Sequence, residues 1–292
     1  MQTLIEIFSP DFLLRNSVYA SLLAGLACPL VGIWLVLRRL VFLGVALPQI
    51  ASAGVAFALS VHVWMGHLDV SHGEEQRALA FIGSVGFTVL AILWLAWLER
   101  RGRGLGEGRL GTAYVLATAI SILLLAKCPV AERGWLNLLK GEIIAISNPD
   151  LVLTGIAMAT VLVMLWRFHK EFLLVSFDRE LAVTLGRNVG GWDLLLFGLI
   201  GSTVAVAVLS VGPLIAFGFL LIPPLIARHF ARSMRQLALG ASLLGGITAL
   251  AGFVLAYCWD LPVGPTDVAL LGVIYALTAA AKGLIAGRTV PN

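Results

Sequence analysis

The sequence has little charge for its length. Asp, Glu, Lys and Arg together make up 12% of the 292 residues, whereas 60% are hydrophobic and the mean hydropathy is +0.98. Soluble domains carry about twice that share of charge. No segment alternates between apolar and polar residues over the roughly 10 positions of a barrel strand. The composition therefore predicts an all-α integral membrane protein with many spans, whose net charge of +4 calls for no nucleic-acid partner.

The sequence also lacks the short motifs of several enzyme classes. No G-x-x-x-x-G-K-[ST] run and no H-E-x-x-H run occurs, so we expect neither a P-loop nor a zinc-protease site. The Gly-rich stretch 102–109 lacks the P-loop lysine and reads as a flexible basic loop. Ser210 has no histidine partner at membrane depth, which disfavours an intramembrane serine enzyme. We expect no enzyme activity and no cofactor bound by this chain.

Cysteine is scarce, and its spacing does not suggest a metal site. Cys28, Cys128 and Cys258 form no C-x-x-C pair, and isolated thiols in membrane segments usually act as small hydrophobes. A removable signal peptide is also not evident, because the first residues contain Glu6 and Asp11 and lack a basic start. Residues 1–16 are expected to lie at the membrane interface as a lead-in to the first span.

Long apolar runs occupy most of the chain. A span needs about 20 apolar residues to cross roughly 30 Å of hydrocarbon. The run from 194 to 227 carries no charge and is too long for one crossing, so we divide it at "SVGP" (210–213), where Gly and Pro suit a turn, with a re-entrant piece as the alternative. The predicted spans lie near residues 17–37, 44–64, 78–98, 110–126, 151–166, 193–210, 212–227, 237–257 and 268–286, which gives eight or nine in a single transmembrane domain, 1–292.

Lys and Arg are distributed unevenly between the two sides of these spans. With the N-terminus outside, one side carries 15 of them and the other side carries 5. Because cytoplasmic loops are enriched in Lys and Arg, the richer side is expected to face the cytoplasm. Cys128 and Cys258 then both lie on the outer side, where either a disulfide or two separate thiols is compatible with the sequence.

The longest cytoplasmic connection contains a short amphipathic segment, residues 175–190. Asp178 is a good N-cap, and Gly186 is a plausible helix stop. Leu181, Ala182 and Leu185 form an apolar stripe between them. The pattern predicts a short helix parallel to the membrane, which is either a docking element or a plain interfacial helix.

Several stretches of the chain follow one another in a recognisable order. "GLACPLVGIWLVLRRLVFLG" (25–44) ends a first span in a basic pair, and "LLKGEIIAISNPDL" (138–151) is an outer loop. "FDRELAVTLGRNV" (177–189) is similar to the motif F-D-x-E-x-A-x-x-x-G-x-x-V. "SVGPLIAFGFLLIPPLIARHFARS" (210–233) and "DLPVGPT" (260–266) follow it. Together, from about residue 10 to 286, the chain resembles the permease subunits of ABC importers that take up zinc, manganese or iron.

This resemblance implies partners and docking residues. Two permease chains, identical or paralogous, would enclose a path in the inner cell membrane, and a separate ATPase dimer would bind ATP and Mg. The matching residues for ATPase docking are Phe177, Asp178, Glu180, Ala182 and Gly186. An extracytoplasmic metal-binding protein would approach the outer side, where Asp260, Pro262 and Gly264 match the family's outer motif.

The expected metal ligands are missing from the second span. The family begins this span with G-D-x-x-x-H, a carboxylate and an imidazole on one helix face. Val45 and Gln49 occupy the two positions here, and neither suits zinc or manganese as those ligands do. Gln49, Ser52 and Pro48 remain candidates for the path, although Gln49 could equally hydrogen-bond a neighbouring helix. The substrate is then a different molecule, a hydrated or chelated metal, or an ion whose ligands come from a paralogous permease.

Two further possibilities remain in the sequence. The outer loop from His62 to Arg77 holds His67 and His72 with loose spacing, which favours a plain polar loop over metal capture. An ATP-independent secondary transporter would normally need charged residues inside the membrane. Because we expect no Asp, Glu or His near the middle of a span, with Asp193 and His62 near span ends, this alternative is disfavoured.

Overall fold

The protein is a bundle of helices. The computed structural model describes residues 14–64, 73–100, 107–126 and 148–287, and the regular structure in these ranges is α-helical. The helices are α2 (Arg15–Leu37), α3 (Val41–Trp64), α4 (Gly73–Arg100), α5 (Glu107–Ala126), α7 (Asn148–Arg167), α8 (His169–Phe177), α9 (Arg179–Thr184), α10 (Val189–Val211), α11 (Pro213–Arg228), α12 (Met234–Trp259) and α13 (Val263–Gly287).

Every predicted apolar run coincides with a helix, but two of these helices, α5 and α11, are not long or apolar enough in their described residues to count as candidate spans. Seven described helices meet that test by length and composition: α2, α3, α4, α7, α10, α12 and α13. The predicted break at Gly212 is confirmed, because this residue separates α10 from α11 with a φ of 86°, a value that favours glycine. The 16 residues of α11 extend about 24 Å, less than the roughly 30 Å of a bilayer core.

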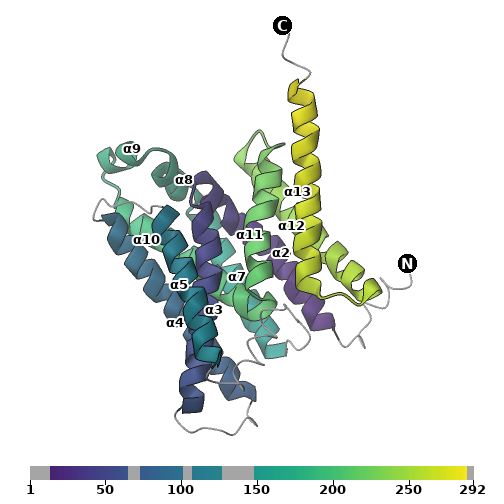
Figure 1. The fold of residues 1–292 in the computed structure, drawn as a ribbon. Helices are drawn as coiled ribbons and strands as arrows, with labels where there is room; N and C mark the ends of the chain where they lie inside the picture. Colours follow the sequence, from purple (N-terminus) through teal and green to yellow (C-terminus); the bar gives the residue numbers. More distant parts are fainter. Residues whose placement is uncertain (1–13, 65–72, 101–106, 127–147, 288–292) are drawn as a thin grey trace.

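The helices form a buried centre and an exposed periphery (Figure 1). The most apolar stretches of α2, α3 and α10 are largely buried, whereas less than a third of the corresponding stretches of α4, α7 and α13 is buried. Exposed side chains of the outer helices include Leu90, Trp94 and Leu277, as expected for surfaces that face lipid. The apolar pattern did not predict helix α8. Phe172 of α8 packs against this centre, and its ring centroid lies 5.7 Å from that of Trp34 and 5.9 Å from that of Trp192.

Close packing in the bundle depends on glycine where α3 crosses α4. A Cβ atom added to Gly54 would lie 2.2 Å from the carbonyl oxygen of Gly83, and one added to Gly83 would lie 2.3 Å from that of Gly54. The two backbones therefore touch, as small residues allow in membrane helix pairs.

The bundle has two distinct ends. Ile33 of α2, Ala227 of α11 and Leu237 of α12 pack together at the end where α8 and α9 lie, which we call the α9 end. At the opposite end, Val18 of α2 packs with Phe253 of α12, next to Val263 of α13. Figure 1 shows α8 and α9 at the top of the bundle and the turn between α12 and α13 low on its right side.

Candidate functional site

The segment 177–186, which we call the α9 element, contains the short capped helix α9 and begins with Phe177, the last residue of α8. The Asp178 side chain accepts a hydrogen bond from the backbone N–H of Leu181 at 2.9 Å, as predicted for an N-cap. The helix ends at Thr184, and Gly186 follows with a φ of 70°. Both predicted helix boundaries are therefore confirmed within two residues.

The apolar side chains of the α9 element point in two directions. Ala182 is fully buried and packs with Val175 and Val189. Phe177, Val183 and Leu185 instead expose 68%, 61% and 59% of their surface. The single apolar stripe predicted from Leu181, Ala182 and Leu185 is therefore wrong in detail, because Leu181 and Leu185 lie outside the buried cluster. Glu180 is exposed as well. The element thus presents a mixed apolar and acidic surface away from the bundle.

The predicted path residues lie in the first half of α3. Val45 and Gln49 are partly exposed and share one helix face by their spacing, whereas Pro48 and Ser52 are buried. The helix continues through Pro48 without interruption. Among the described residues, no group of three or more His, Cys, Asp or Glu could hold a metal ion.

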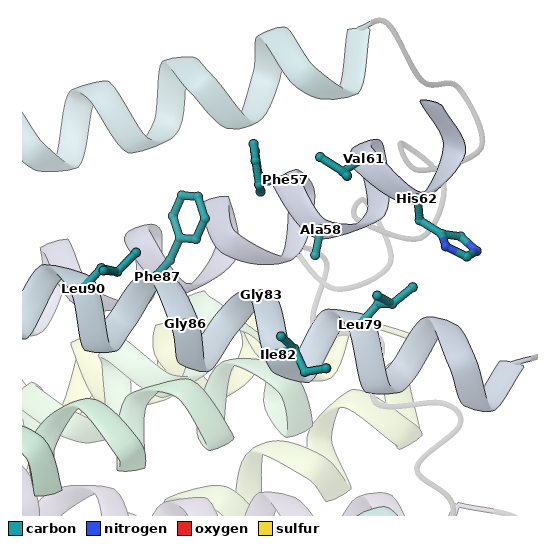
Figure 2. Close-up of a pocket in the computed structure, with 10 residues that line it drawn as sticks. All are labelled: Phe57, Ala58, Val61, His62, Leu79, Ile82, Gly83, Gly86, Phe87 and Leu90. Carbon is teal, nitrogen blue, oxygen red and sulfur yellow. The ribbon is translucent and has the colours of Figure 1, made fainter. Parts of the chain in front are cut away.

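A hollow of about 300 Å³ lies between α3 and α4 and does not include these path residues (Figure 2). Its lining is almost entirely apolar, with Phe57, Ile82, Phe87 and Leu90 among the side chains, and His62 lies near its end. This lining offers an ion no set of polar ligands. The hollow is therefore not a second candidate for the metal path.

The predicted outer motif forms the turn between α12 and α13, opposite the α9 end. Asp260 adopts the left-handed conformation with a φ of 54°, and the N–H of Leu261 donates to the carbonyl of Ala256 at 2.9 Å. Asp260 and Pro262 are exposed, whereas Gly264 is buried. Asp260 and Pro262 thus lie in the connection itself, and Gly264 lies in the first turn of α13.

A buried carboxylate, Asp267, lies just after this turn and was missed by the sequence analysis. Ser21 Oγ donates to Asp267 Oδ2 at 3.4 Å, and Oδ1 has no hydrogen-bond partner among the described residues. Oδ1 lies against Gly252, where an added Cβ would be 1.8 Å away. The predicted span began at residue 268, but α13 begins at Val263, and this boundary error placed Asp267 outside the membrane.

Other predicted sites fall outside the described residues. These are the loop residues His67 and His72, the outer stretch 138–147 and Cys128. Cys258 is exposed and has no disulfide in the described part of the chain. Its pairing with Cys128 stays a prediction.

Comparison with known families gives this arrangement a context. The family described as the ABC 3 transport family matches residues 11–282. The chain belongs to this family. As an ABC 3 family member it is a multi-pass membrane permease subunit of a metal ABC importer, and it is a transport subunit without catalytic activity.

Two related proteins of this family have named substrates. The high-affinity zinc uptake system membrane protein ZnuB of Haemophilus influenzae is 24% identical over 265 residues, which cover 89% of this chain and 96% of that protein. The manganese import system permease protein ScaB of Streptococcus gordonii is 23% identical over 265 residues, covering 91% of this chain and 90% of that protein. At these identities the relatives do not establish which metal this ABC 3 permease carries.

A solved structure supports the same fold. The structure of PsaBC from Streptococcus pneumoniae in complex with Fab is similar with a TM-score of 0.78 and 22% identity, covering 95% of this chain and 94% of that chain. The likeness extends over nearly the whole ABC 3 permease, so its helices have the arrangement of that chain.

Proposed function

We propose that this permease forms the path for a divalent metal ion, zinc or manganese, and that a separate ATPase dimer docks on the α9 element. The observation that carries the proposal is the exposed apolar surface of Phe177, Val183 and Leu185 on the α9 element, whose helix is capped and whose Ala182 is buried. An apolar helical surface of this kind fits a groove in a partner protein. The buried contact of Ala182 keeps the element fixed, so that force on its outer surface reaches the bundle.

The distribution of charge supports a cytoplasmic location for the α9 end. The connections assigned to this side hold 15 Lys and Arg, against 5 on the other side. Arg38, Arg179 and Arg228 all belong to it. Because positive residues favour the cytoplasmic side, the ATPase has access to the α9 element and the N-terminus lies outside.

Two copies or paralogues of the permease are proposed to enclose the path. Val45 and Gln49 keep part of their surface exposed in a single chain, although they lie on a largely buried helix. A second chain packed against this face would turn it into a lining. The turn at Asp260, at the opposite end, is the proposed contact for an extracytoplasmic metal-binding protein.

A chelated metal or a non-metal substrate is the second candidate. The observation that favours it is the pair Val45 and Gln49, which supplies one neutral amide where the family's ligands are expected. A chelate arrives with its ligands and needs only a polar, roomy path. The two candidates therefore differ in the transported substrate, and both assume the same permease and ATPase.

Transport by the reconstituted importer tests the proposal. Permease, ATPase and binding protein would be placed in vesicles and supplied with free zinc, free manganese or a ferric chelate. ATP-dependent uptake of a free ion is the expected result. Uptake of the chelate alone would favour the second candidate, and uptake that ignores ATP would contradict both.

A further inference from the structure

Side chains from four segments of the α9 end are linked around Asp193: two arginines bind its carboxylate, and Ser176 is joined to it through Arg38. Arg38, the residue after α2, donates from Nη1 to Asp193 Oδ1 at 2.6 Å and from Nε to Ser176 Oγ of α8 at 2.8 Å. Arg179, the first residue of α9, donates from Nη2 to Asp193 Oδ2. We call Arg38, Ser176, Arg179 and Asp193 the Asp193 cluster. It joins the α9 element to both α2 and α10.

The ion pair of Arg38 and Asp193 within this cluster is buried. The side chains of Arg38 and Asp193 expose 9% and 6% of their surface. Buried ion pairs are often no more stabilising than apolar residues of similar size, because both charges lose their hydration. Burial of this pair therefore points to a role in holding specific segments together rather than to stability alone.

The guanidinium group of Arg38 makes two hydrogen bonds and one ring contact, but one of its nitrogen atoms has no hydrogen-bond partner in the described residues. Its guanidinium lies over the Phe197 ring of α10, 5.8 Å from the ring centre, in addition to its two hydrogen bonds. Its Nη2 is buried and has no acceptor within the described part of the chain. A buried donor without an acceptor is unfavourable. The hydrogen bonding of Arg38 is therefore incomplete in this arrangement of the cluster.

The position of Arg38 connects the cluster to the path. Arg39 follows in the left-handed conformation with a φ of 57°, and α3 begins at Val41. Val45 and Gln49 lie on the next turns of α3. A displacement of Arg38 therefore acts directly on the start of the helix that carries the candidate path residues.

We propose that Asp193 is the positioning residue that transmits movement of the α9 element, through Arg179, to Arg38 and the start of α3. The carboxylate bridges the two arginines, one of which is exposed toward the proposed ATPase and the other buried in the bundle. The inference rests on the proposed function, since it takes the α9 element as the ATPase contact. It adds the route by which ATP hydrolysis opens the path.

The test is the number of metal ions moved per ATP hydrolysed by the complete importer in vesicles. Asp193→Asn keeps the size of the side chain and removes its charge. It is expected to assemble with the ATPase and to hydrolyse ATP, while the ratio of metal to ATP falls about tenfold, a typical coupling strength between sites. Lys170→Gln, at an exposed cation of α8 outside the cluster, is the matched control and is expected to keep the wild-type ratio.

Arg179→Gln provides a second test, because the Arg179 side chain is exposed and its replacement disturbs the buried pair less. It is also expected to lower the ratio of metal to ATP, and it provides the test if Asp193→Asn fails to assemble. Because both changes break the same bond, the double variant should lose no more coupling than Asp193→Asn alone. An unchanged ratio in the variant that assembles, or fully additive losses, would overturn the role of Asp193. A wild-type importer that moves no metal would overturn the proposed function as well, which separates the two failures.

Discussion

The α9 element and the first half of α3 differ in how closely their residues match the family's motifs. The α9 element keeps its N-cap, its buried anchor and an exposed apolar surface around Phe177. The face of α3 carries Val45 and Gln49, in place of the carboxylate and imidazole expected from the family resemblance. The proposed ATPase contact and the proposed substrate contact therefore lie in separate parts of the chain. The ATPase contact matches the family's motif more closely than the substrate contact does.

Removing the exposed aromatic ring of the α9 element should have the largest effect. Phe177→Ala is expected to weaken ATPase binding by about 2 kcal/mol or more, as for an aromatic hot spot, which is roughly 30-fold. Phe230→Ala is the matched control, because Phe230 lies at the same end and exposes 66% of its surface against 68% for Phe177. Affinity of the purified permease for its ATPase measures both, and equal losses would contradict a specific role of the α9 element.

Filling the helix crossing of α3 should weaken the fold. Gly54→Ala places a methyl group against the backbone of Gly83, and overpacking of this kind costs about 1–3 kcal/mol. Gly86→Ala, on the facing helix, meets open space and should leave stability unchanged or slightly higher. Thermal unfolding of the two variants in detergent makes the comparison. Similar melting temperatures would show that the contact at Gly54 does not hold α3 in place.

Restoring the family's ligand pair should strengthen metal binding by the permease and leave its binding to the ATPase unchanged. The double change Val45→Asp and Gln49→His puts a carboxylate and an imidazole on one helix face. We expect zinc to bind about tenfold more tightly than in the wild type, or about 1.4 kcal/mol. Gln49→Asn is the control, since it keeps the amide. Titration calorimetry measures both, and wild-type binding as tight as that of the double variant would reveal ligands elsewhere.

Replacing the buried carboxyl group near the outer turn should have the smallest effect. Asp267→Asn keeps an acceptor for the Ser21 hydroxyl and replaces a side chain whose Oδ1 has no partner in the described residues. The free energy of unfolding should fall by less than about 1 kcal/mol. Thermal unfolding and uptake are measured together. A stable variant with strongly reduced uptake would instead make Asp267 part of the transport path.

Local features of the sequence predicted local structure well. Asp178 and Gly186 act within one or two turns of the chain, and Gly212 interrupts a helix by its own conformation, so these features were identified from the residues themselves. The span boundaries were less accurate, because an apolar run does not mark where a helix begins. Asp267 was missed for this reason, and α8 was missed because its position depends on ring contacts with α2 and α10.

Contacts between distant segments could not be predicted. Arg38 and Asp193 are 155 positions apart, and each looked like an ordinary charge at the end of a span. Only the packing of α2 against α10 brings them together. The Asp193 cluster therefore comes from the structure, whereas the α9 element was already visible in the sequence.

The most direct test measures ATP-dependent uptake and equilibrium binding of the same metal on one preparation of the importer. Because the docking surface is retained and the ligand pair is absent, we predict ATP-dependent uptake of zinc or manganese with no tight metal binding by the permease itself. Tight stoichiometric binding by the wild-type permease, or metal flux that continues without ATP, would contradict the account.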